Sequence, residues 1–75
     1  MKNIEALIAN GGSISLDAHD DHGCVAAACD AHNSLALLVW RNGESLTALL
    51  KRLDKAIALA NDEGVLTDEV NDSTS

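Results

Sequence analysis

The chain has 75 residues and a formal net charge of −7, with 12 Asp and Glu against 5 Lys and Arg. This length supports a single domain with a small core, and the acidic balance argues against binding nucleic acid through its phosphates. No apolar run approaches the roughly 18 residues of a membrane span. The N-terminal segment lacks the long apolar stretch of a signal peptide. We therefore expect a cytoplasmic protein whose Cys24 and Cys29 are thiols.

The apolar content is unusual in kind. Hydrophobic residues make up 47% of the chain, but many are alanines and Trp40 is the only aromatic residue. A core built from such small side chains leaves a lone monomer marginally stable. Composition therefore favours self-association.

The first element in the chain is a short helix. Residues Lys2–Asn10 place Ile4, Leu7 and Ile8 on one side, and two glycines follow at positions 11 and 12. A helix of this length is not stable alone, so we expect it to dock on another element.

Three strands follow, because the apolar period changes from that of a helix to that of a strand. Ser13–Ala18 alternates polar and apolar residues, which is typical of a half-buried strand. Cys24–Cys29 is a run of small apolar residues and Leu35–Arg41 is strongly apolar. Turn-forming residues separate these three segments, at 19–23 and 30–34.

The clearest element is a helix between Glu44 and Asn61. Its apolar residues recur at helical spacing; they are Leu46, Leu49, Leu50, Leu53, Ile57 and Ala60. Asn42 or Ser45 can cap its start, and Gly64 suits its C-terminal end.

The element order predicts an α+β fold, α-β-β-β-α, in which two helices pack on one face of an antiparallel three-stranded sheet. We expect residues 1–70 to form this domain. Residues 71–75 are acidic and polar, and we expect them to be a disordered tail.

Strand alternation divides the apolar residues between two sheet faces. One face takes Val25, Ala27, Leu35, Leu37 and Val39, and the other takes the alanines at 26, 28 and 36 with Leu38 and Trp40. Two helices cover only one face, so we expect an exposed apolar anchor formed by Leu38 and Trp40. Such a patch marks an interface with a partner or with a second copy, giving a homodimer through the apolar sheet face. The alternative is that residues 65–70 fold back and cover it.

Acidic residues gather around the first two strands. Asp17, Asp20, Asp21 and Asp30 occur in a stretch without Lys or Arg. We expect them to form an anionic surface that contacts basic side chains of a partner protein, so that reversing the charge of Asp20 and Asp21 weakens binding. The alternative is a solvated hairpin tip.

Catalytic and metal sites find little support. His22, Cys24, Cys29 and His32 are residue types that bind zinc, but five strand steps separate the sulfurs by roughly 16 Å and place them on opposite faces. We therefore expect no metal, no cofactor and no enzyme activity, and keep a zinc-stabilised domain as the alternative. The α-β-β-β-α order also occurs in double-stranded RNA-binding domains, but residues 44–47 at the start of the last helix include no lysine.

The segment E-S-L-T-A-L-L-K-R-L-D-K-A-I at 44–57, followed by L-T-D-E-V-N at 66–71, resembles the C-terminal half of small uncharacterised proteins encoded by bacteriophages and prophages. This resemblance implies a phage accessory protein in a bacterial host and carries no catalytic residues. Combined with the charge, it suggests an inhibitor of a host protein machine, such as an anti-CRISPR-type inhibitor that occupies a basic site. A more distant topological resemblance is to homodimeric regulatory proteins of the HicB-like antitoxin type, which is the alternative function.

Overall fold

The computed structural model describes residues 1–19 and 23–70 and confirms an α+β fold with two helices. The elements, in chain order, are α1 (Lys2–Ala9), β1 (Ser13–His19), β2 (Gly23–Cys29), β3 (Ser34–Val39), α2 (Leu46–Glu63) and β4 (Thr67–Asp68). Both helices and the first three strands lie where the sequence predicts them. The predicted tail at 71–75 lies outside the described residues.

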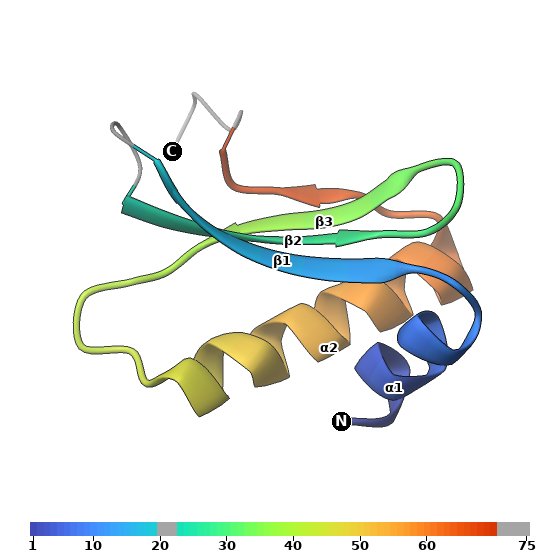
Figure 1. Ribbon diagram of the computed structural model, residues 1–75, viewed down its shortest axis with the longest axis horizontal. Coiled ribbons are helices and arrows are strands. Elements are labelled where there is room, and N and C mark those ends of the chain that lie inside the picture. Colours follow the sequence, from blue (N-terminus) through green and yellow to red (C-terminus); the bar gives the residue numbers. More distant parts are fainter. Residues whose placement is uncertain (20–22, 71–75) are drawn as a thin grey trace.

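The sheet is mixed and has four strands in the order β1-β2-β3-β4. The first three are antiparallel, whereas β4 runs parallel to β3 with Thr67 opposite Ala36. The expectation of three antiparallel strands therefore misses β4. Residues 65–70 do fold back, but β4 extends the edge of the sheet beside β3 instead of covering a face (Figure 1).

Both helices lie on the same side of the sheet (Figure 1). α2 packs chiefly on β2 and β3, while α1 contacts α2 and β1. The sheet contributes Ala26, Ala28 and Ala36 to the core, all fully buried. The small side chains of these alanines leave room for the apolar side chains of α2 to pack against the sheet. The buried residues of α2 are Leu49, Leu53, Ala56 and Ile57.

A β-bulge interrupts the pairing of β2 with β3. The register shifts between Ala28 and Cys29, which face Ala36 and Ser34, so Leu35 is the extra residue on β3. Leu35 is buried in the core with the helices. Strict alternation had placed it on the opposite face with Leu37, and that assignment is wrong because a bulge resets the alternation.

The two helices are capped differently. Ser45 accepts a hydrogen bond from the Ala48 amide, and Gly64 ends α2 in the left-handed region at φ 68°, as the sequence predicts for both. α1 has no side-chain cap of its own. Instead Asp54 of α2 accepts hydrogen bonds from the Ile4 amide at 2.9 Å and the Asn3 side chain at 3.0 Å. The short helix is thus capped by its neighbour.

Candidate functional site

The expected apolar anchor of Leu38 and Trp40 is wrong in its placement. Leu38 is 2% exposed and lies in the core beneath the helices, and Trp40 packs against the same core. The indole N–H of Trp40 donates to the backbone oxygen of Glu44 at 2.6 Å. Apart from Leu35, alternation assigned these residues to the two faces correctly, but it could not say which face the helices cover. They cover the alanine-rich face, because small side chains allow α2 to approach the sheet closely.

The face that the two helices leave uncovered carries a different apolar strip. It is formed by Val25 and Ala27 of β2 with Leu37 and Val39 of β3, which the pairing places side by side. Ser15 and Asp17 of β1 flank it on one side, since they pair with Ala27 and Val25. Asp68 of β4 flanks it on the other, beside Leu37. We call these seven residues the open sheet face.

The charge of this face has one sign. Its two ionisable members, Asp17 and Asp68, are acidic, and the four strands contain no lysine or arginine. Val25 is buried although no helix covers it, while Leu37 and Val39 are half-buried and Asp17 is exposed. The open sheet face is therefore an apolar strip between acidic margins.

The structure separates the two predicted acidic residues that it describes, Asp17 and Asp30. Asp17 lies in β1 opposite Val25, whereas Asp30 follows Cys29, which pairs with Ser13. Four strand steps separate those positions by roughly 13 Å. Asp20 and Asp21 lie outside the described residues. Of the predicted anionic surface, the described part of the chain therefore shows Asp17 at one end of β1 and Asp30 beyond the other.

Asp30 forms the turn between β2 and β3. Its carboxylate accepts hydrogen bonds from the amides of His32 at 2.8 Å and Asn33 at 2.6 Å. These two bonds hold the pKa of Asp30 below its ordinary value, because they stabilise the ionised form. The structure therefore gives this residue a local role in the turn.

The two cysteines are free thiols in one strand, β2. Cys29 lies 3.8 Å from the hydroxyl of Ser34. Within residues 1–19 and 23–70, no three His, Cys, Asp or Glu side chains are grouped closely enough to hold a metal ion. His22 lies outside the described residues.

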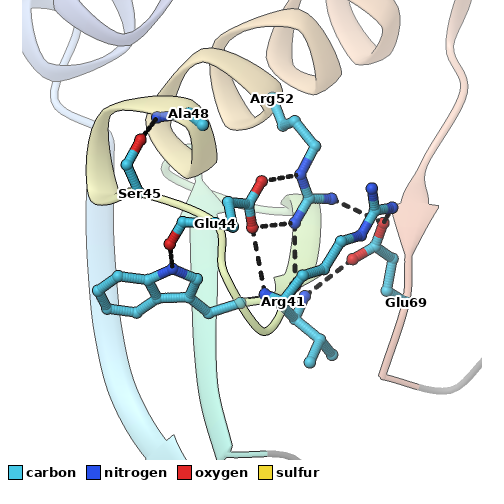
Figure 2. A network of polar contacts seen from close by, with 8 residues as sticks. Arg41, Glu44, Ser45, Ala48, Arg52 and Glu69 are labelled. Carbon is cyan, nitrogen blue, oxygen red and sulfur yellow. Dashed lines mark hydrogen bonds and ion pairs between the residues drawn. The ribbon is translucent and has the colours of Figure 1, made fainter.

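A polar network, missed by the sequence analysis, lies at the edge of the sheet where β3 meets β4 (Figure 2). Arg52 of α2 is at its centre. Its guanidinium donates to Glu44 at 2.7 and 2.9 Å, to Glu69 at 3.0 Å and to the carbonyl oxygen of Val39 at 2.9 Å. Glu69 in turn accepts from the Val39 amide at 2.9 Å. Arg52 therefore bridges Glu44 and Glu69.

Hydrogen bonding to Arg52 dominates the electrostatics of this network. It lowers the pKa of Glu44 to about 2, and the same carboxylates raise the pKa of Arg52. Only one weak signal in the sequence points to this arrangement: Arg52 lies next to Leu53 and three residues after Leu49, at the margin of the apolar stripe of α2. An arginine there can reach past the core to the sheet edge.

An open groove of about 220 Å³ lies beside the network. Its lining includes Arg41, Arg52 and Lys55, three of the five basic residues of the chain. Arg52 already donates to two carboxylates and a carbonyl oxygen, and Arg41 contacts Glu69 at 3.4 Å. The groove is smaller than the pockets of about 300 Å³ or more that hold small ligands. Arg41 and Arg52 in the groove therefore serve the contacts that hold β4 and α2 together.

Neither helix in the described part of the chain is long and apolar enough to cross a membrane. Comparisons of the chain with protein-family models, with curated proteins and with solved structures found no match.

Proposed function

We propose that this chain is a non-enzymatic binding protein that occupies a basic surface of another protein with its open sheet face. The observation that carries the proposal is the apolar strip of Val25, Ala27, Leu37 and Val39 between Asp17 and Asp68. A partner surface with an apolar centre and a basic rim complements this arrangement.

The hydrogen bonds of the acidic groups support binding over catalysis. Glu44 and Glu69 are held by Arg52, Asp54 caps α1, and Asp30 closes a turn. A general acid or base must reach a substrate with a free proton-transfer site. These four carboxylates instead stabilise the fold.

The nature of the target rests on the resemblance to phage-encoded proteins. Such a protein acts in the cytoplasm of a bacterial host, and its negative charge would allow it to compete with nucleic acid for a groove lined by Lys and Arg. We therefore include inhibition of a host nucleic-acid machine, as by an anti-CRISPR-type inhibitor, in the proposal.

The proposal is tested by affinity purification from bacterial lysate with four immobilised chains: wild type, Asp17→Lys, Leu37→Ser and Glu63→Lys. Glu63 ends α2 and is exposed, so Glu63→Lys gives the same change in charge away from the open sheet face. A target should bind wild type and the Glu63→Lys control, be lost from the other two variants, and elute with increasing salt.

The proposal is wrong if the same proteins are retained by Asp17→Lys and Leu37→Ser as by wild type. Reversal of Asp20 and Asp21 to lysine is a separate arm, which asks whether the segment after β1 adds to the surface. Circular dichroism of each variant confirms that a lost target does not reflect unfolding.

A further inference from the structure

The outer edge of β1 has no neighbour among the described residues, since β1 is the terminal strand of the sheet. It pairs with β2 in regular register over all seven residues, Ser13–His19. Edge strands are commonly protected from pairing by Lys, Pro or a bulge. β1 contains none of these: its sequence is SISLDAH, and the described bulge of the sheet lies between β2 and β3.

The pattern of the ladder shows which main-chain groups of β1 point outward. The Trp40 amide donates to the Cys24 carbonyl, so Cys24 is turned toward β3. Because orientation alternates along an antiparallel strand, Val25 and Ala27 are turned toward β1. Their partners Asp17 and Ser15 therefore use their main-chain groups on β2. The N–H and C=O groups that point away from the sheet are those of Ile14, Leu16 and Ala18.

We propose that β1 pairs antiparallel with β1 of a second copy of this chain, across a two-fold axis at Leu16. In that register Leu16 lies opposite Leu16 of the second copy, and Ile14 lies opposite its Ala18. All three outward residues then exchange both of their main-chain hydrogen bonds with the other copy. The spacing of these residues is symmetric about Leu16, so the strand is its own complement.

The side chains fit the same register. Leu16 is 42% exposed on the side of the helices, because the eight-residue α1 is the helix that packs on β1. Pairing places the two Leu16 side chains against each other and removes this apolar surface from water. On the other face, Asp17 lies opposite Ser15 of the second copy. An axis at Asp17 would instead set two carboxylates directly opposite each other, which is unfavourable.

The resulting dimer joins two four-stranded sheets into one, with all helices on the same side. This is an isologous two-fold contact, the commonest kind in homodimers. The sequence suggests a homodimer through the apolar face of the sheet. The contact proposed here lies instead at the edge of the sheet. The inference does not depend on the proposed function, because it rests on the outward main-chain groups of Ile14, Leu16 and Ala18 and on no residue of the apolar strip. Asp17 and Ser15, which border that strip, also lie at the contact.

The test begins with the wild-type chain. Light scattering over a roughly hundredfold range of concentration should show the mass rise toward twice 7.8 kDa. Amide hydrogen exchange at the same concentrations should show slower exchange at Ile14, Leu16 and Ala18 as the dimer forms. The amide of Val39, which already donates to Glu69, should not change.

Two matched variants locate the contact. Leu16→Lys places two like charges on the two-fold axis and removes both buried leucines, so the dissociation constant should rise by about 100-fold or more. Leu59→Lys makes the same change at a leucine that is 40% exposed beside the opposite edge of the sheet, and its dimer should be unaffected.

Three results would overturn the proposal: a monomer at all concentrations, a dimer whose Ile14, Leu16 and Ala18 amides exchange as fast as in the monomer, or an unchanged dimer for Leu16→Lys. The second would assign the dimer to another surface. If Leu16→Lys does not fold, the exchange of the three wild-type amides decides alone.

Discussion

The outward main-chain groups of β3 and of β1 differ in how they are satisfied. β4 has only two residues, yet outward main-chain groups of Leu37 and Val39 in the neighbouring β3 are hydrogen-bonded. The Leu37 carbonyl accepts from the Glu69 amide at 2.8 Å, the Val39 amide donates to the Glu69 carboxylate, and the Val39 carbonyl accepts from Arg52. β1 has seven residues, and no described residue makes such contacts along its outer edge. The edge of β3 is therefore closed by β4, Glu69 and Arg52, and we call it the closed edge; the outer edge of β1 is the open edge.

Side chains continue the ladder where the backbone of β4 ends. The Glu69 carboxylate takes the place of the next main-chain carbonyl, and the guanidinium of Arg52 takes the place of the next amide. This protects an edge without the lysine or proline that edge strands commonly carry. Within residues 1–19 and 23–70, no side chain closes the outer edge of β1 in this way, which leaves that edge open to the proposed pairing with a second copy.

The largest expected effect comes from breaking the closed edge at its centre. Arg52→Met removes the partner of Glu44, of Glu69 and of the Val39 carbonyl at once. Leaving partly buried acidic groups unpaired should lower the free energy of unfolding by about 2–3 kcal/mol, and Tm by on the order of 10 °C. Urea unfolding followed by the fluorescence of Trp40, the only aromatic residue, measures this directly.

Lys51→Met is the matched control. It removes the same charge from the adjacent position of α2, where the side chain is exposed, and should change stability little. Equal losses for the two variants would show that the helix responds to net charge and that the contacts of Arg52 are not responsible.

Acid should weaken the closed edge through Glu44. The pKa of Glu44 falls from its ordinary 4.5 to about 2 in the folded protein because Arg52 donates to it. A lowered folded pKa means that the stabilisation is fully present above pH 4.5 and is lost as the pH falls toward 2. Thermal melts between pH 7 and 2 should show this loss in wild type and a flatter profile in Glu44→Gln. Identical profiles for the two proteins would contradict the assignment.

A smaller effect is expected from the helix beneath the open edge. Asp54→Ala removes the acceptor that caps α1, and the loss of a cap costs about 1 kcal/mol. Burial raises the pKa of Asp54, but hydrogen bonds from Ile4 and Asn3 together outweigh it and hold the pKa below its ordinary value. Asp54→Asn keeps an acceptor oxygen and should retain part of the stability.

Asp62→Ala is the control for Asp54→Ala, because it removes an exposed carboxylate from the same helix. Hydrogen exchange should show faster opening of α1 in Asp54→Ala while β3 stays protected. Equal exchange throughout α1 in Asp54→Ala and Asp62→Ala would mean that packing of Leu7 alone holds the helix.

The sequence predicts the elements that have a strong local pattern. Helical spacing identifies α2, Gly64 identifies its C-terminal end, and alternation identifies β1. For the start of α2 the sequence offers Asn42 or Ser45, and the structure selects Ser45. β4 escapes prediction because two residues carry no periodicity. Which face the helices cover also cannot be predicted locally, because both faces are apolar. The answer depends on how closely α2 can approach the alanines.

The expected apolar anchor of Leu38 and Trp40 is misplaced for the same reason. Alternation put Leu38 and Trp40 on one face correctly, but that face is inside. Glu44, Arg52 and Glu69 are far apart in sequence, and no local pattern links them before β4 is placed. Long-range side-chain contacts of this kind follow from the tertiary structure and are not encoded in a short motif.

The smallest effect is expected at the rim of the closed edge. Arg41 also contacts Glu69, but at 3.4 Å and with its side chain 63% exposed. An exposed pair of this geometry contributes about 0.5 kcal/mol or less, so Arg41→Gln should unfold in urea nearly as wild type does. A loss as large as that of Arg52→Met would mean that the edge is held by the number of positive charges near Glu69. A negligible loss would support the view that it is held by Arg52, because that guanidinium also reaches Glu44 and the Val39 carbonyl.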